Sequence, residues 1–309
     1  MTQAIAFDSG EFLPAERLSI PVYDSGFMLG ATISDQLRTF GGKLFAVERH
    51  LARLQRSLHI LGLDPGLSTQ QIAEAATEVS RHNHDLLANG DDLACAVLIS
   101  PGANTAMAPP REDRPRVRIH TYPLPFSQWH RNYEDGVALS VPAVRQTPAN
   151  CWPPELKCRS RMHYYLADRQ AKAIDPSSRA IMLDQEGYVL EATTANVLLF
   201  HESEGIISPP LEDILHGVSL NTLEQLARQL SIPFRYRRIQ LEELEKATEI
   251  FLCSTSPCVW PVAKLNGKSI GRLGSDTVAG KLLDAWSALV GINISKQVLE
   301  FSNRKTSTH

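Results

Sequence analysis

The stretch Ala180-Ile-Met-Leu-Asp-Gln-Glu-Gly-Tyr-Val-Leu-Glu-Ala-Thr-Thr-Ala-Asn-Val197 decides the fold of this chain. Two apolar runs, 180–184 and 188–191, flank a Gln-Glu-Gly turn, which predicts a β-hairpin, and a further strand is expected over 196–200. Glu191 ends the second run among apolar and small residues, where a carboxylate is costly to bury without a cationic partner. A protonated pyridine nitrogen would be such a partner, and a purely structural role is the alternative.

A lysine upstream of the hairpin is the second candidate. Lys157 follows Trp152-Pro153-Pro154 and precedes a helix that is expected over 160–174. A lysine held at the junction between a strand and a helix can project into a cleft and lose its water, which lowers its pKa and makes the amine a nucleophile. An ordinary surface lysine would fit the same residues.

Two segments downstream of the hairpin could hold an anion. In Ile214-Leu-His-Gly-Val-Ser-Leu-Asn221, Gly217 immediately precedes a helix expected over 218–230, whose first N–H groups would suit a phosphate together with the Ser219 hydroxyl. A strand expected over 249–253 ends in Ser254-Thr255-Ser256, which adds further hydroxyls. Hydroxyl-rich strand ends are common, so neither segment identifies a ligand by itself.

The N-terminal part of the chain is expected to form a small domain. Alternating apolar residues predict a strand from about Arg17, and a second strand over 36–40 is followed by a hairpin turn at Gly41-Gly42. Leucines spaced three or four residues apart predict a helix over 48–61, and a second helix is expected over 69–87. Strands are expected over 93–100 and 116–122.

The domain boundary is expected at Tyr122-Pro-Leu-Pro-Phe126, which suits neither a helix nor a central strand. The prediction is a small α+β domain over 1–121, an interdomain loop over 122–134, a large domain over 135–295 and a disordered tail over 296–309. The large domain should open with a strand over 137–144 and close with a helix over 277–289.

Composition argues against several classes of protein. The 309 residues carry a formal net charge of −3, so no positive field draws the chain to nucleic acid or to an anionic membrane. No apolar run approaches the ~18 residues that span a bilayer, and the first ten residues lack a signal-peptide pattern. The five cysteines are not spaced as zinc ligands, so we expect no metal and a reduced, cytoplasmic protein. The basic stretch Arg111 to Arg118 includes Glu112 and Asp113, and we interpret it as a solvated loop that runs into a strand.

Taken in order, these pieces resemble the class IV aminotransferases, a family of two-domain, fold type IV enzymes that bind pyridoxal 5′-phosphate (PLP). The family includes branched-chain and D-amino acid aminotransferases, (R)-selective amine transaminases and aminodeoxychorismate lyase. The resemblance extends from about residue 15 to residue 290. The segments that carry it are Asp24-Ser-Gly-Phe-Met-Leu-Gly30, Leu37-Arg38, Glu48-Arg-His-Leu-Ala-Arg-Leu54, Leu156-Lys157, Glu191-Ala-Thr-Thr-Ala-Asn-Val197, Ile214-Leu-His-Gly217, and Phe251-Leu-Cys-Ser-Thr-Ser256 with Pro261.

The resemblance implies roles for the candidate residues. Lys157 matches the lysine that attaches the cofactor, and Glu191 matches the partner of its ring nitrogen. The phosphate ligands are implied to be Arg53, the start of the helix at Gly217, Val218 and Ser219, and the hydroxyl of Thr255. It further implies an α+β, D-amino acid aminotransferase-like fold with the cofactor between two domains, and a homodimer with shared active sites.

The substrate is less strongly indicated. The family's commonest activity, together with the apolar run Phe27-Met28-Leu29, suggests transfer of an amino group from an aliphatic, branched-chain-type amino acid or amine to a 2-oxo acid. Arg38 is the first candidate for the substrate carboxylate, and Arg159 and Arg161 are the others. The run Lys157-Cys-Arg-Ser-Arg-Met162 lacks the Asn-Tyr that branched-chain enzymes usually show after this lysine. A PLP lyase of the aminodeoxychorismate type, a D-amino acid or (R)-amine transaminase, and a PLP-binding protein without turnover therefore remain open.

Overall fold

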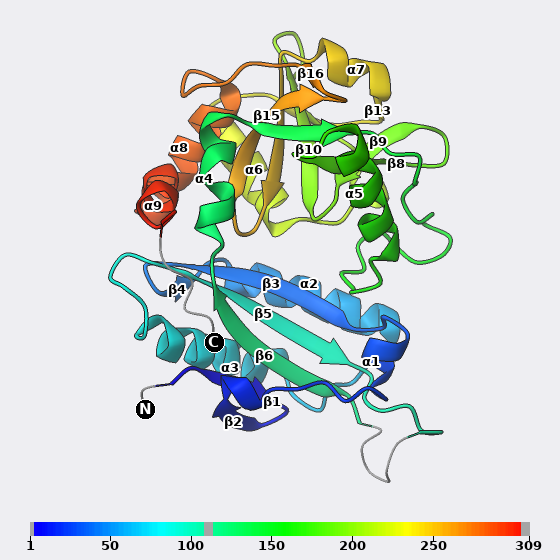
Figure 1. Cartoon of the computed structure of the whole chain (residues 1–309), viewed down its shortest axis with the longest axis vertical. Helices are drawn as coiled ribbons and strands as arrows, with labels where there is room; N and C mark the ends of the chain where they lie inside the picture. The colour runs from blue at the N-terminus through cyan, green and yellow to red at the C-terminus, as the bar shows by residue number, and fades with distance from the viewer. Residues whose placement is uncertain (1–2, 108–113, 304–309) are drawn as a thin grey trace. The chain divides into compact units, whose positions relative to one another are not determined.

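The computed structural model describes residues 3–107 and 114–303, which form two compact units. Unit 1 comprises the chain up to Leu124 together with Leu156–Arg161, and unit 2 comprises Pro125–Glu155 and Met162–Asn303. Each unit combines helices with a sheet (Figure 1). No helix among the described residues combines the length and the apolar character needed to cross a bilayer.

Unit 1 contains, within its described residues, a six-stranded antiparallel sheet in the order β2-β1-β6-β5-β3-β4. Its helices α2 and α3 lie on one face of that sheet (Figure 1). The elements are β1 (Ile5–Asp8), β2 (Glu11–Pro14), the 3-10 helix η1 (Ala15–Arg17), α1 (Ser25–Met28), β3 (Ile33–Phe40), β4 (Lys43–Leu44), α2 (Val47–Leu61), α3 (Thr69–His84), β5 (Leu93–Ser100) and β6 (Arg116–Pro123).

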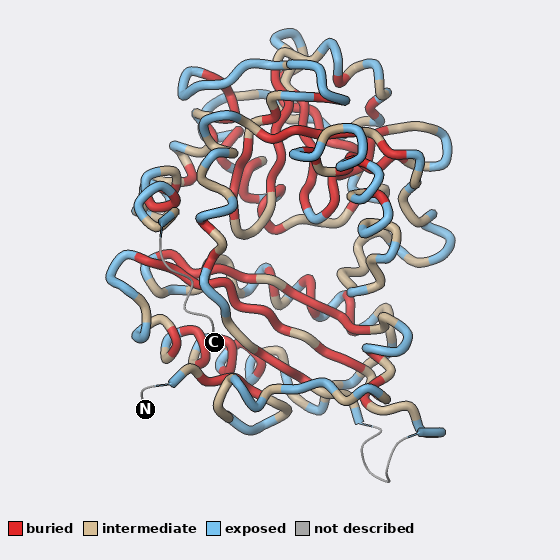
Figure 2. The backbone as a smooth tube through the Cα atoms, viewed as in Figure 1, coloured by how far each residue is buried: buried red, intermediate tan, exposed pale blue. Residues whose placement is uncertain are grey.

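Apolar periodicity explains the packing of unit 1. Leu54 and Leu58 of α2 lie four residues apart on one helix face and are buried against Ile33 and Leu37 of β3, which lie four residues apart on one strand face. Figure 2 shows the strands as the most buried part of the unit. Because the helices cover this face, the residues of β3 that alternate with Ile33 lie on the opposite face of the sheet.

Unit 2 is built on a mixed ten-stranded sheet, counted over its described residues. The elements are α4 (Phe126–Glu134), β7 (Val137–Ser140), α5 (Met162–Ile174), β8 (Ser178–Leu183), β9 (Tyr188–Ala192), β10 (Ala195–His201), β11 (Gly205–Ser208), the 3-10 helix η2 (Leu211–Asp213), α6 (Val218–Gln229), β12 (Phe234–Tyr236), β13 (Ile239–Gln240), α7 (Leu241–Lys246), β14 (Glu249–Ser254), β15 (Cys258–Leu265), β16 (Lys268–Ser269), α8 (Val278–Val290) and α9 (Ile294–Glu300).

The sheet of unit 2 closes on itself. The pairings β10-β14-β15-β7-β8-β9 follow one another along the sheet, and β9 pairs with β10 as well. The enclosed core is apolar and includes Leu139, Ile181, Val197, Leu252 and Val262. The hairpin predicted over 180–191 forms as β8 and β9, so its end at Glu191 lies on this closed ring.

Several elements differ from the sequence prediction. The strand expected from Arg17 is wrong, because η1 ends there and Pro21 interrupts the segment that follows. The N-terminal strands are instead β1 and β2, which were not predicted. The first three residues of the basic stretch 111–118 lie outside the described residues, and Arg116 begins β6 as expected.

The predicted domain limits also need correction. The loop expected over 122–134 contains α4, whose start after Pro125 suits the restricted backbone of proline, and its Phe126 is buried. The tail expected over 296–309 begins inside α9, which is capped by Asn293 and buries Ile294 and Val298 one helical turn apart. Residues 304–309 of that tail lie outside the described residues.

Candidate active site

Unit 1 contains a buried ionic cluster between β3 and α2. Asp35 is 2% exposed and accepts hydrogen bonds from Nε of Arg53 at 3.0 Å and from its Nη2 at 2.8 Å. Nδ1 of His50 lies 2.7 Å from the same carboxylate. Burial alone would raise the pKa of Asp35, but the charge of Arg53 and the proximity of His50 hold it well below its usual range. The ionised carboxylate therefore fixes the Arg53 guanidinium.

A short extended segment places Lys157 beside this cluster. The Lys157 carbonyl accepts from the N–H of Ser34 at 2.9 Å, and the N–H of Arg159 donates to the carbonyl of Thr32 at 2.8 Å. The segment thus forms an isolated β-bridge, in which Cys158 lies opposite Ile33 at the start of β3. The N–H of Lys157 also donates to Oγ of Ser57 on α2 at 3.3 Å. Hydrogen bonds to a strand and to a helix therefore hold its backbone.

The amine of Lys157 is strongly perturbed. Burial lowers its pKa to about 7, the charges of Arg53 and Arg161 add to this effect, and Asp35 opposes it. Among the described residues, no hydrogen bond or ion pair engages its Nζ. Near neutral pH a large fraction of this amine is neutral, which is the form that reacts as a nucleophile.

Unit 2 holds Glu191 in a network of donors. The hydroxyl of Tyr164 on α5 donates to Oε1 at 2.6 Å, and Nε2 of Gln146 donates to the same oxygen at 2.8 Å. The backbone N–H of Leu215 reaches Oε2 at 3.4 Å. Glu191 is 5% exposed, so these donors replace water and fix the orientation of the carboxylate.

The start of α6 has the features of an anion site. Gly217 is its N-cap, and no side chain among the described residues caps the first N–H groups. A Cβ added to Gly217 would collide with Oδ1 of Asn196 on β10, so glycine permits this close approach. The hydroxyls of Ser219 and Thr255 make no hydrogen bond to any described residue. Together with the N–H groups of Val218 and Ser219, they offer donors that an oxyanion could accept.

Arg38 does not have the environment expected of a substrate ligand. It is fully buried in unit 1, its guanidinium carbon lies 3.9 Å from the centroid of the Phe40 ring, and its Nε donates to the carbonyl of Thr39 at 3.1 Å. In this structure its guanidinium therefore has no surface that a ligand could reach.

The other substrate candidates are more accessible. Leu29 is 68% exposed, Arg159 is exposed, and Arg161 is half-buried with its Nε donating to the carbonyl of Cys158 at 3.2 Å. Burial lowers the pKa of His120 on β6, and the charge of Arg159 lowers it further, so these two side chains are electrostatic neighbours.

The structure thus brings together some of the residues that the sequence predicts for the cofactor site. Lys157 and Arg53 share one cluster in unit 1, and Glu191 contacts the segment before α6 in unit 2. Sequence reasoning missed the residues that orient them, which are Asp35, His50, Gln146 and Tyr164. The sequence did contain a signal for Asp35 and His50. A carboxylate lies inside the apolar strand 33–40, and a histidine and an arginine follow three residues apart on the next helix.

Comparison with known proteins identifies the family to which these features belong. Residues 32–265 match the amino-transferase class IV family. A probable branched-chain-amino-acid aminotransferase of Thermotoga maritima is 28% identical over 291 residues, 91% of this chain and 94% of the relative. A D-alanine aminotransferase of Staphylococcus epidermidis is 25% identical over 276 residues, 88% of this chain and 93% of the relative.

Solved structures show the same fold. The branched-chain aminotransferase of the thermophilic archaeon Thermoproteus uzoniensis, with norvaline, superposes with a TM-score of 0.81 at 23% identity. This match covers 96% of this chain and 97% of that one. The branched-chain amino acid aminotransferase of Escherichia coli gives a TM-score of 0.84 at 22% identity, covering 93% and 95% of the two chains.

Proposed function

This chain belongs to the class IV aminotransferase family and is an enzyme, and from that premise we propose that it is a PLP-dependent transaminase that moves an amino group from an aliphatic amino acid, branched-chain ones included, to a 2-oxo acid. The observation that carries the proposal is the Lys157 amine, whose pKa is lowered to about 7 beside an arginine fixed by a buried carboxylate. A structural or surface lysine would not need such an environment.

The residues present fit PLP. Lys157 would attach the cofactor through its Nζ, and Glu191 would accept a hydrogen bond from the ring nitrogen. Arg53, the first-turn N–H groups of Val218 and Ser219, and the hydroxyls of Ser219 and Thr255 would hold the phosphate. The support for this assignment is that these hydroxyls and the lysine amine have no hydrogen-bond partner among the described residues, and that Gly217 leaves no space for a side chain at the start of α6.

Bound PLP supplies an electron sink for the bonds at the α-carbon of an amino acid. The neutral amine of Lys157 can take a proton from that carbon and return one, because a pKa of about 7 suits both directions near neutral pH. Arg53 lowers the pKa of that amine. Glu191, held by Tyr164 and Gln146, would accept a hydrogen bond from the protonated ring nitrogen and so favour that protonated form.

We assign substrate recognition to the accessible candidates. Because Arg38 is buried, Arg159 and Arg161 are better placed in unit 1 to bind the substrate carboxylate. An arginine binds a carboxylate through two parallel hydrogen bonds. Leu29 would contact the aliphatic side chain, in keeping with its large exposed surface.

A panel of amino donors tests the proposed reaction. We expect leucine, isoleucine or valine to convert the bound cofactor to pyridoxamine 5′-phosphate, and pyruvate or 2-oxoglutarate to reverse this change, both followed by absorbance. Conversion by D-alanine or (R)-1-phenylethylamine alone would reassign the donor. Release of pyruvate from an aminodeoxychorismate-like substrate without conversion of the cofactor would replace the transaminase with a lyase.

The role of Glu191 can be tested through Tyr164. Tyr164→Phe removes the 2.6 Å hydrogen bond to Oε1, so we expect the pH titration of the bound cofactor's absorbance to shift while PLP is still bound. The neighbouring Tyr165 is 62% exposed, and Tyr165→Phe serves as the matched control. Identical titrations for the two variants would show that Tyr164 is merely structural.

We also propose a cytoplasmic homodimer. The support for a dimer is the exposed apolar surface of α1, where Phe27 is 67% and Met28 is 41% exposed, because such patches commonly mark protein interfaces. The support for the cytoplasm is that all five cysteines are free thiols, because reducing compartments keep cysteines unpaired.

A further inference from the structure

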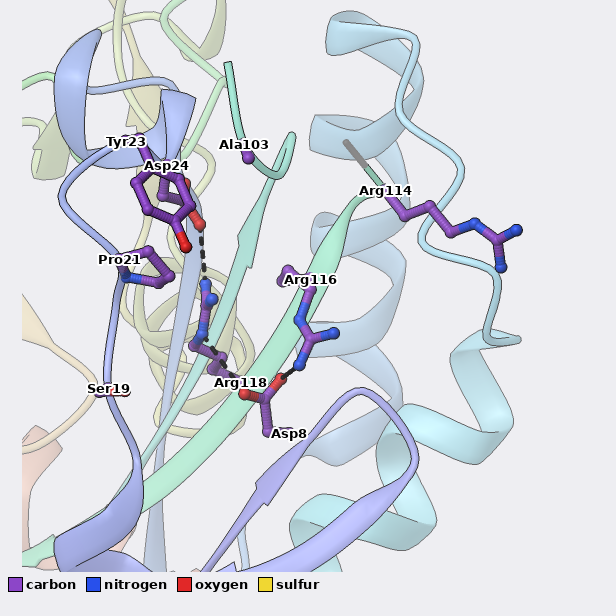
Figure 3. A pocket seen from close by; sticks show the side chains of 9 residues that line it. All are labelled: Asp8, Ser19, Pro21, Tyr23, Asp24, Ala103, Arg114, Arg116 and Arg118. Carbon is purple, nitrogen blue, oxygen red and sulfur yellow. Dashed lines mark hydrogen bonds and ion pairs between the residues drawn. The ribbon is translucent and has the colours of Figure 1, made fainter. Parts of the chain in front are cut away.

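Unit 1 contains a cavity of about 480 Å³ that shares no residue with the set assigned to PLP. Three arginines from one stretch of chain line it: Arg114 just before β6, and Arg116 and Arg118 within that strand. Asp8 of β1 and Asp24, which precedes α1, complete its charged lining. Figure 3 shows Arg118 between the two aspartates and Arg116 directed at Asp8.

The geometry of the strand explains why the arginines gather. Arg116 and Arg118 are two residues apart in β6, so their side chains leave the same face of the sheet. That face is opposite to the one that α2 and α3 cover, because Val117 and Ile119 are buried in the core against those helices. The apolar alternation of the strand therefore directs its basic residues into the cavity.

Arg118 is buried but only partly satisfied. It is 4% exposed, and its Nη1 donates to Oδ2 of Asp24 at 3.1 Å and to Oγ of Ser100 at 3.2 Å. Its Nε is buried and has no hydrogen-bond partner among the described residues, since Oδ2 of Asp8 is 3.8 Å away and too distant to accept. A buried donor without an acceptor is unfavourable, so Asp24, Ser100 and Asp8 do not fully satisfy the Arg118 guanidinium.

The charges of the lining favour an anion. Three arginines and two aspartates give the cavity a formal charge of +1. Arg116 contacts Asp8 through Nη2 alone, at 2.8 Å. Its other donors bind no described residue, so they are available to a ligand. Arg114 is exposed and has no partner among the described residues.

We propose that this cavity binds a small-molecule oxyanion, a phosphate or a carboxylate, between Arg116 and Arg118. The oxyanion accepts from the donors of Arg116 that Asp8 leaves unused and is attracted by the charge of Arg118 in the same lining. Guanidinium groups bind both kinds of anion through paired hydrogen bonds, so the chemistry of recognition is the same for a phosphate ester and for a dicarboxylate. Asp8 competes with the anion for the same arginines. Removing an arginine should therefore weaken anion binding, whereas removing the charge of Asp8 should strengthen it.

Calorimetric titration of the PLP-loaded protein tests the site at low ionic strength. Inorganic phosphate and succinate are separate probes, and succinate has neither an amino nor a 2-oxo group that a transaminase could use. We expect saturable binding of at least one probe. Arg116→Gln should weaken it about tenfold, because one charge-assisted contact is lost. Asp8→Asn should strengthen it, because the competing carboxylate becomes a neutral amide and the lining charge rises.

Matched controls lie on α3 of the same unit. Arg81→Gln and Glu78→Gln change the net charge by the same amounts at an exposed ion pair, and they should leave the affinity unchanged. Both affinity changes at the cavity are required, so a variant that loses its fold cannot imitate the result. Absence of saturable binding, or equal affinity in wild type and in Arg116→Gln, overturns the proposal. The readout is binding and not turnover, so it is independent of whether the proposed transaminase activity is found.

Discussion

At the scale of the residue, the environment of the Lys157 amine makes the free energy of unfolding depend on pH. Its pKa is about 7 in the folded chain and 10.5 in an ordinary lysine, so between these values the unfolded chain binds more protons than the folded one. The contribution of Lys157 to the free energy of unfolding must therefore rise as the pH rises from about 7 to 10.5. Below pH 7 the amine is protonated in both the folded and the unfolded chain, so the cost of burying its charge has its full value.

We therefore expect PLP-free Lys157→Met to be more stable than the PLP-free wild type at pH 7, with a difference that shrinks toward pH 10. Urea unfolding across this range measures the difference. Lys268→Met, at an exposed lysine of β16, is the control. A stability difference that does not change with pH would contradict the assigned environment of Lys157.

Asp35 is a second residue whose effect can be predicted. Asp35→Asn leaves the buried Arg53 without its ionised partner, and removing one partner of a buried pair costs roughly 3–5 kcal/mol. We expect a loss of that order in the free energy of unfolding, together with weaker PLP binding. Glu78→Gln breaks an exposed pair with Arg81 and should have little effect on either measurement. Similar stability for both variants would show that the Asp35 pair is unimportant.

At the scale of the element, the strongly periodic segments were predictable. Helices α2 and α6, the hairpin of β8 and β9, and the strands β5 and β6 follow the sequence closely because each has one buried face with a regular apolar pattern. The bridge beside Lys157 was not predictable, because it consists of two hydrogen bonds between segments more than a hundred residues apart in the chain. Likewise, Tyr164 lies on a helix with no strong apolar pattern, and its link to Glu191 exists only in the folded unit.

The start of α6 gives a prediction for an element. In Gly217→Ala the new Cβ collides with Oδ1 of Asn196, so the first turn of α6 must move away from β10. We expect weaker PLP binding, measured by fluorescence or absorbance titration. Asn196→Ala removes the obstructing atom, so the double variant should recover part of the loss, beyond what the two single variants would give by addition. Strict additivity would mean that this contact does not position the helix.

At the scale of the whole molecule, the exposed apolar run at α1 predicts the state of assembly. Phe27→Asp should shift the protein from dimer to monomer in light scattering after size exclusion, because a charge would enter an apolar interface. Leu289→Asp changes a 54% exposed residue of α8 in unit 2 and should not alter the mass. A wild-type protein that is monomeric at all concentrations would refute the proposed dimer.

The segment Leu156–Arg161 belongs to unit 1 although more than thirty residues of unit 2 precede it in the chain. During translation, the first 124 residues therefore emerge from the ribosome before the segment that bridges to the edge of β3 has been made. Until it arrives, the N–H of Ser34 and the carbonyl of Thr32 have no partner there, and an unpaired strand edge invites association with other chains. The nascent N-terminal unit therefore keeps this strand edge open until residues 156–161 are made, and the lysine that we propose as the cofactor's attachment point arrives with the same few residues that cover the edge.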